Sequence, residues 1–176
     1  IGRIGSGKST LAKLLIRLYE PTSGSVLMDG FDINQLDPAD LRHNVAYVAQ
    51  DAKLYFGTLR DNITFGLNGI TDQQVVDAAE QAGILELVNS HPLGFEMPVG
   101  ERGETLSGGQ RSAIAMARVF LRKPRVLVMD EPTSAMDQGT EERLTQQIKT
   151  RFSNSTLLII THKMSMLTLV DRLIVV

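Results

Sequence analysis

Residues 2–9 read Gly-Arg-Ile-Gly-Ser-Gly-Lys-Ser and fit the pattern G-x-x-x-x-G-K-[ST] without departure. A loop of this kind normally follows a buried strand and opens a helix, which constrains the chain to an α/β fold. Its backbone amides and the helix N-terminus bind phosphate oxygens. Lys8 is expected to reach the β- and γ-phosphates and the Ser9 hydroxyl to coordinate Mg²⁺. The predicted nucleotide-binding residues are Gly2, Arg3, Ile4, Gly5, Ser6, Gly7, Lys8, Ser9 and Thr10.

A second group of candidate residues follows the apolar run at 126–129. This run is continuous rather than alternating, which is typical of a strand buried on both faces of a parallel sheet. Asp130 would stand at the carboxyl end of that strand, where ligands bind in open α/β sheets, and would complete the Mg²⁺ shell. Glu131 follows at once and is the candidate general base that polarises an attacking water.

The order of apolar runs and helical patterns predicts a mostly parallel sheet with helices on both faces. Strands are expected at residues 25–29, 45–48, 126–129, 156–160 and 173–176. Helices are expected at residues 8–19, from Pro38 after a capping Asp37, after a capping box of Thr71 and Gln74, at 107–124, and after a capping Thr140.

Residues 56–121 interrupt this pattern with short helical pieces that glycine and proline separate. We interpret them as an α-helical subdomain inserted into a core of residues 1–55 and 122–176, so that 1–176 is a single domain. The chain begins one residue before the phosphate-binding loop, lacks an initiator Met and stops on an apolar run. We therefore expect a fragment that lacks the first strands of the sheet and the C-terminal end of the domain.

Composition and charge exclude other classes of protein. The 176 residues are 43% hydrophobic and 22% charged, with a formal net charge of −2, so no nucleic-acid partner is expected. No apolar run approaches the roughly 18 residues that a membrane-spanning helix needs. Cysteine is absent and histidine occurs three times, so a disulfide framework is impossible and a structural zinc site is not expected.

A signature segment lies between the phosphate-binding loop and the Asp130-Glu131 pair; it consists of Leu106, Ser107, Gly108, Gly109 and Gln110. In this order the three motifs resemble those of the nucleotide-binding domain of an ABC transporter, over almost the whole chain. The resemblance implies a P-loop NTPase (RecA-like) core, ATP and Mg²⁺ as cofactors, and hydrolysis of ATP to ADP and phosphate coupled to transport.

The resemblance also implies roles for individual residues. Gln50 matches the glutamine that contacts the metal and the water, and His162 matches the switch histidine that contacts the γ-phosphate. Ser134 and Asp137 match the D-loop, with Met136 where leucine is common. The implied catalytic residues are Glu131, His162 and Gln50, and the implied metal ligands are Ser9, Gln50 and Asp130.

The signature segment has the features of a second anion-binding site. Ser107 is a helix N-cap type of residue, and the glycines after it leave the amides exposed, so the signature segment is a second anion-binding helix start. The family resemblance implies a head-to-tail homodimer, in which residues 106–110 of one chain cover ATP on the phosphate-binding loop of the other. A transmembrane domain, on the same chain or on a partner chain, is the other implied partner.

Several segments resemble exporters in particular. Residues 98–103 resemble a short loop found in exporters but not in importers. Residues 35–42 and 91–95 resemble ATPases of bacterial type I secretion systems, which implies export of a protein or peptide, with the soluble domain at the cytoplasmic face of the bacterial inner membrane. Alternatives are a lipid or multidrug exporter and a soluble non-transport ABC ATPase. DNA-repair ATPases with these motifs insert a long coiled coil, and residues 10–106 show no sustained heptads.

Overall fold

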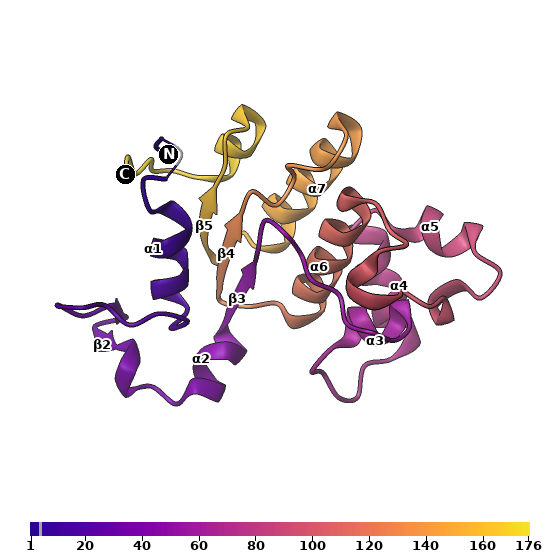
Figure 1. Cartoon of the computed structure of the whole chain (residues 1–176), viewed down its shortest axis with the longest axis horizontal. Helices are drawn as coiled ribbons and strands as arrows, with labels where there is room; N and C mark the ends of the chain where they lie inside the picture. Colours follow the sequence, from indigo (N-terminus) through magenta and orange to yellow (C-terminus); the bar gives the residue numbers. More distant parts are fainter. Residues whose placement is uncertain (4) are drawn as a thin grey trace.

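The computed structural model describes residues 1–3 and 5–176, so the expected contact of Ile4 with phosphate lies outside the described residues. Three parallel strands form the main sheet in the order β3 (Val45–Val48), β4 (Val126–Asp130) and β5 (Thr156–Ile160). In Figure 1 this sheet stands between α1 on one side and α6 and α7 on the other. The expected α/β fold, with a parallel sheet and helices, is confirmed.

Side chains of β4 alternate between two hydrophobic cores, as the period of a strand requires. Leu127 and Met129 belong to the core that includes residues of α6 (Gly108–Arg122) and α7 (Gln138–Arg151). Val128 belongs to the second core, which includes Ala12 of α1 (Lys8–Leu15). Because Asp130 has the same parity as Val128, it belongs to the face on which α1 packs.

Helix α1 ends four residues before the predicted limit of residue 19. Arg17 adopts a left-handed backbone with φ of 54°, which stops the helix. Its guanidinium donates to the carbonyl oxygen of Leu36 at 3.0 Å. Leu18 is 58% exposed, and the fully buried residue of the helix is Ala12. The apolar spacing of the sequence therefore predicted too long a helix. Its last four predicted residues form a turn, which the hydrogen bond from Arg17 to Leu36 O holds in place.

A small antiparallel hairpin follows α1. It pairs β1 (Leu27–Met28) with β2 (Phe31–Asp32), shorter than the predicted strand at 25–29. Asp29 and Gly30 form the turn with φ of 51° and 85°, as a two-residue hairpin turn with both central residues left-handed requires. The chain then forms η1 (Ile33–Gln35) and α2 (Pro38–Asn44), and Asp37 caps α2 as predicted.

Residues between β3 and β4 form a group of helices at one end of the molecule (Figure 1). They are α3 (Leu59–Thr64), α4 (Asp72–Gln81), α5 (Leu85–Ser90), η2 (Gly94–Glu96), η3 (Glu101–Gly103) and α6. Thr71 and Gln74 form the predicted capping box at the start of α4. Val75, Ala78 and Ala79 of α4 are buried in the same core as α6.

The predicted strand at residues 173–176 is not formed. Among the described residues, the segment after η4 (Met164–Leu169) pairs with Ile1 alone. The Ile1 ammonium donates to Ile174 O at 2.6 Å, and its carbonyl accepts from Val176 N at 2.9 Å. Val175 is 77% exposed, because no strand among the described residues lies beside it. The first and last residues of the chain therefore lie side by side (Figure 1).

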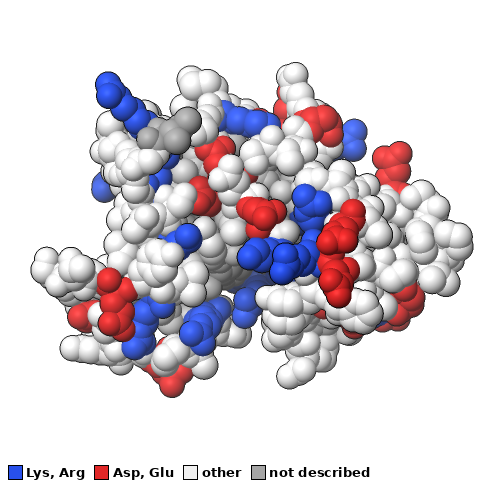
Figure 2. All heavy atoms as spheres, in the orientation of Figure 1, with Lys and Arg blue, Asp and Glu red and all other residues white. Residues whose placement is uncertain are grey.

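Positive and negative side chains lie close together over the face that Figure 2 shows, in line with a formal net charge of −2. Among the described residues no helix combines the length and the apolar character that crossing a membrane requires.

A buried polar group joins α3 to α6. Asn62 is 1% exposed, and its side chain accepts from Tyr55 N at 2.8 Å and donates to Tyr55 O at 2.9 Å and to Thr58 O at 3.0 Å. Arg118 of α6 donates to Asn62 Oδ1 at 2.9 Å, to Asn62 O at 2.6 Å and to Lys53 O at 3.2 Å. Burial lowers the pKa of Arg118. The segment before α3 is therefore fixed to α6.

Replacing Asn62→Ala should lower the free energy of unfolding by about 2–4 kcal/mol, because it removes the side-chain partner of Tyr55 N and Tyr55 O and one of the three acceptors of the buried Arg118 guanidinium. Urea unfolding followed by circular dichroism measures the change. The matched control is Asp72→Ala, which removes the exposed Arg60–Asp72 pair of 2.6 Å and should cost at most about 1 kcal/mol. Equal losses for both variants would contradict the role of Asn62.

Candidate nucleotide-binding site

The phosphate-binding loop turns into α1 through two left-handed glycines. Gly5 and Gly7 have φ of 81° and 97°, a conformation that other residues rarely adopt. Gly7 is the N-cap of α1 and provides no side-chain cap to the first turn. Lys8 Nζ points back into the loop and donates to Gly2 O at 3.0 Å, Arg3 O at 2.6 Å and Ser6 Oγ at 3.4 Å.

This arrangement fits a bound phosphate. The amides of the first helical turn have no side-chain acceptor at the cap, and the positive end of the helix dipole adds to their attraction for an anion. The Lys8 ammonium lies within the same loop, where it can exchange its carbonyl acceptors for phosphate oxygens. The predicted residues 2, 3 and 5–10 are therefore brought together at the start of α1.

Asp130 lies at the carboxyl end of β4, buried to 4% exposure. The Tyr47 hydroxyl of β3 is 3.5 Å from Asp130 Oδ2, on the face of the sheet that α1 covers. Burial raises the pKa of Tyr47, and the negative charge of Asp130 raises it further. The sequence does not single out Tyr47 as a site residue, because it lies within a strand and belongs to no recognisable motif.

The few oxygen ligands near Asp130 fit a magnesium ion better than a metal ion whose ligands are all protein side chains. Among the described residues no cluster of three histidine, cysteine or acidic side chains could hold a metal ion. Magnesium is usually bound by one or two carboxylates together with water and substrate phosphates. Asp130 and the Ser9 hydroxyl would supply the protein oxygens, and the ion would neutralise charge on the phosphates.

Glu131 is held in an unusual backbone conformation. Its φ is 49°, a region that non-glycine residues mostly avoid, and its N–H donates to Ile160 O at 2.8 Å. Its Oε1 lies 3.1 Å from His162 Nε2, but the contact does not have hydrogen-bond geometry. Oε1 is therefore buried with no hydrogen-bond partner among the described residues, which is typical of a group that works on a ligand or water.

Gln50 lies in the bend that follows β3, and it is exposed. The carboxyl ends of neighbouring parallel strands meet at the same edge of a sheet. Gln50 follows β3, Asp130 is the last residue of β4 and His162 follows β5, so the sheet places all three at one edge.

The signature segment begins α6. Ser107 Oγ accepts from Gln110 N at 3.2 Å, and Gln110 Oε1 accepts from Ser107 N at 2.8 Å, which is a complete capping box. A Cβ on Gly108 would lie 3.0 Å from Ala135 Cβ, and one on Gly109 would lie 2.8 Å from Ala135 O. The two glycines thus allow α6 to start directly against residues 134–137, and Leu106 is buried beneath them.

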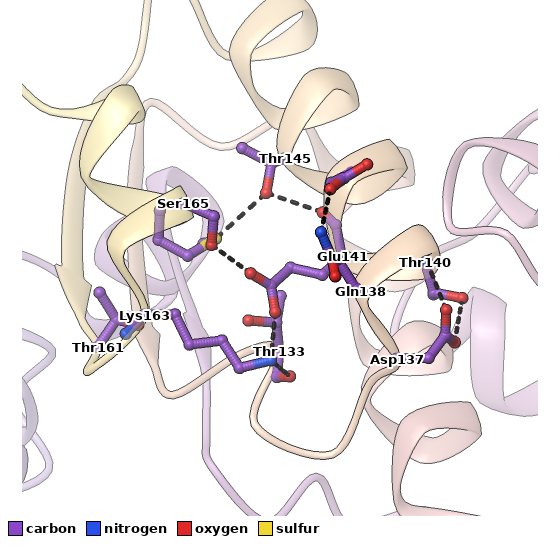
Figure 3. A network of polar contacts seen from close by, with 11 residues as sticks. Thr133, Asp137, Gln138, Thr140, Glu141, Thr145, Thr161, Lys163 and Ser165 are labelled. Carbon is purple, nitrogen blue, oxygen red and sulfur yellow. Dashed lines mark hydrogen bonds and ion pairs between the residues drawn. The ribbon is translucent and has the colours of Figure 1, made fainter.

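Asp137, rather than the predicted Thr140, is the N-cap of α7. Asp137 accepts from Thr140 N at 2.9 Å and from Thr140 Oγ1 at 2.6 Å (Figure 3). These hydrogen bonds hold the pKa of Asp137 below its ordinary value. Thr140 is therefore the third residue of the helix, and its prediction as the cap was wrong. Ser134, the other D-loop residue, is exposed.

Lys8 and Ser107 start helices that pack on opposite faces of the sheet. Helix α1 belongs to one core and α6 to the other, with β4 between them (Figure 1). The two helix starts that were predicted to bind anions therefore lie on different faces of the sheet.

Comparisons with known proteins agree with this geometry. Residues 1–134 match the family model described as ABC transporter. The chain is 44% identical to ATP-binding cassette sub-family B member 10, mitochondrial, of Mus musculus, over 94% of this chain and 24% of that protein. It is 45% identical to a multidrug efflux ATP-binding/permease protein of Mycobacterium bovis, over 99% of this chain and 15% of that protein.

A solved structure extends the comparison to three dimensions. The structure of a bacterial Atm1-family ABC exporter with ATP bound superposes with a TM-score of 0.90 at 37% identity, over 94% of this chain and 29% of that chain. The chain therefore spans less than a third of the length of each of these relatives.

Replacing Gly109→Ala should destabilise the fold by about 1–3 kcal/mol, because the new methyl group would overlap Ala135 O and push α6 away from residues 134–137. Urea unfolding measures the loss. Gly139→Ala is the matched control, since its Cβ would come no closer than 3.4 Å to Asp137 Oδ1 and the helix would gain up to about 1 kcal/mol. The interpretation fails if Gly109→Ala is as stable as the original chain.

Proposed function

The chain belongs to the ABC transporter family as the ATP-binding domain of an exporter, and from this premise we propose that it binds and hydrolyses ATP to drive outward transport. The observation that carries the proposal is the buried Glu131 carboxylate, whose unpartnered Oε1 lies 3.1 Å from His162 Nε2 beside Asp130. A purely structural carboxylate at this position would have its oxygens satisfied.

Binding is assigned to the phosphate-binding loop. The amides of residues 5–10 hold the β- and γ-phosphates, and Lys8 neutralises part of their charge. Ser9, Asp130 and Gln50 would hold Mg²⁺, which would supply positive charge to the phosphate oxygens. Each of these side chains stands at the edge of the sheet where β3 and β4 end or at the start of α1.

Hydrolysis is assigned to Glu131 and His162. The Glu131 carboxylate accepts a proton from a water molecule as the water oxygen attacks the γ-phosphorus. The bond between that phosphorus and the oxygen bridging to the β-phosphate breaks, which gives ADP and phosphate. His162 contacts the γ-phosphate and orients it toward the water, and its 62% exposed ring leaves it free to approach the substrate.

A second copy of the chain completes each site. The signature segment, residues 106–110, presents helix amides and the Ser107 hydroxyl on the face opposite to α1. A two-fold, head-to-tail homodimer places the signature segment of each copy over the ATP of the other, so that two sites form. Asp137 lines the same cavity as Ser107, Gly109 and Gln110. We assign Asp137 and Ser134, which also matches the D-loop, to the same interface.

The relatives favour a particular kind of exporter. Their names describe a multidrug efflux ATP-binding/permease protein and an Atm1-family ABC exporter. We therefore prefer a multidrug or Atm1-type exporter to the type I secretion system that residues 35–42 and 91–95 suggest. The proposed partner is a transmembrane domain, and the proposed place of the domain is the cytoplasmic side of the membrane.

We also propose that the domain consists of a core and a helical insertion. We place the core at residues 1–55 and 122–176 and the helical insertion at 56–121. The insertion contains α3–α6 as a packed group, and Asn62 and Arg118 fix its first helix to its last. The signature segment would therefore move with this group as one body.

Two substitutions separate binding from hydrolysis. Lys8→Ala should weaken ATP binding at least 10-fold, because the loop loses the positive charge that faces the phosphates. Glu131→Gln should retain ATP binding, lower hydrolysis at least 100-fold and trap a dimer in the presence of ATP and Mg²⁺. Binding is measured with a fluorescent ATP analogue, hydrolysis by phosphate release and dimer formation by light scattering, all in the full-length protein.

Glu142→Gln is the control for the loss of a carboxylate, since Glu142 is exposed on α7 and bonds only with Gln138 among the described residues. Its hydrolysis rate should match that of the original protein. Undiminished hydrolysis by Glu131→Gln would overturn the assigned role of Glu131.

A further inference from the structure

A largely buried polar network joins α7 to the segment that follows β5 (Figure 3). Neither the family motifs nor the proposed chemistry uses it. Its centre is Glu141 of α7, which is only 6% exposed. Charged side chains are rarely buried to this extent unless they are paired. The network is defined here as Thr133, Glu141, Lys163 and Ser165.

Glu141 binds two residues of the segment that follows His162. Its Oε2 forms an ion pair with Lys163 Nζ, and its Oε1 accepts a hydrogen bond from Ser165 Oγ. Burial alone would raise the pKa of Glu141, but the hydrogen bonds from Lys163 and Ser165 hold it below its ordinary value. The carboxylate is therefore charged and bound on both oxygens.

Lys163 also contacts the loop that follows Glu131. Its ammonium donates to Thr133 O at 2.8 Å, two residues beyond Glu131 in the sequence. Its own backbone N–H donates to Thr161 Oγ1 at 3.0 Å, which fixes the turn that contains His162. One side chain thus connects the turn at residues 161–163 to the loop at 131–133.

A second hydrogen bond joins the same two segments. Glu131 N donates to Ile160 O at 2.8 Å, so the loop at 131–133 is bonded to the segment at 160–163 at both of its ends. His162 lies between these two bonds, and its ring is 62% exposed. The position of the His162 ring relative to Glu131 therefore depends on the backbone that Lys163 holds.

We propose that Glu141 and Lys163 are positioning residues for ATP hydrolysis, which act by holding His162 against Glu131. The inference rests on the proposed function, because it concerns the rate of the hydrolysis assigned to those two residues. The Glu141–Lys163 pair is only partly buried, with 32% of the Lys163 side chain exposed, and ion pairs that solvent reaches contribute little to stability. The contacts of Lys163 instead hold the loop at 131–133 at a set distance from the turn at 161–163. Both segments must be in place for hydrolysis.

The test uses Lys163→Met, which keeps the length of the side chain but removes the charge and the donor to Thr133. In the full-length protein we expect kcat for ATP hydrolysis to fall about 10- to 100-fold, while ATP affinity changes less than about 2-fold. Lys163→Arg should recover most of the rate, because a guanidinium can still donate both to Glu141 and to Thr133. A residue with a merely structural role would not separate kcat from affinity in this way.

Glu141→Gln is a second variant for the case in which Lys163→Met does not fold. It keeps the shape of the side chain and should lower kcat in the same direction with unchanged ATP affinity. The controls are Lys149→Met and Glu142→Gln, which change exposed residues of the same helix and should leave kcat unchanged. Hydrogen exchange gives a readout that is independent of turnover: amides at residues 161–166 should exchange faster in Lys163→Met than in Lys149→Met.

The outcomes separate this inference from the proposed function. An original protein that does not hydrolyse ATP would overturn the proposed function. An original protein that does hydrolyse ATP, together with a Lys163→Met variant of unchanged kcat, would overturn the positioning role alone. The role is also overturned if kcat and ATP affinity fall together and Lys163→Arg restores neither.

Discussion

The pairing of β4 with strands on both sides is the constraint on which the rest of the site depends. The parallel register fixes Leu127 and Met129 toward α6 and α7 and leaves Val128 and Asp130 on the face that α1 covers. The same pairing continues one step beyond the strand, since Glu131 N donates to Ile160 O. A metal-ligand candidate and a general-base candidate therefore stand at fixed positions relative to α1 and β5.

Helices on both faces of this sheet allow one chain to contribute to two of the proposed composite sites. Helix α1 presents the phosphate-binding loop, and α6 presents the signature segment from the other core. Gly108 and Gly109 allow the start of α6 to touch Ala135, so the signature segment and the D-loop form one surface. The helix that begins this surface is fixed through Arg118 to the segment after Gln50, which links the half of one proposed composite site to the half of the other within the same chain.

Features set by local sequence were predictable, and features set by tertiary contacts were not. The strands at 45–48 and 156–160 and the capping box at Thr71 follow from short-range patterns, and they were predicted correctly. Apolar residues at 173–176 suggested a strand, but a strand needs neighbours, and the described chain gives this segment only Ile1. The contact of Glu141 with Lys163 joins residues 22 positions apart, and only the folded chain brings them together.

The measurement that most directly tests a site shared between two chains is a mixing experiment. Copies with Lys8→Ala and copies with Ser107→Arg, each inactive alone, are co-expressed and assayed for ATP hydrolysis. In a mixed dimer, one of the two sites has both an intact phosphate-binding loop and an intact signature segment. Because about half of the dimers are mixed, the mixture should recover about a quarter of the original rate. No recovery in a mixture that contains mixed dimers would contradict the shared site.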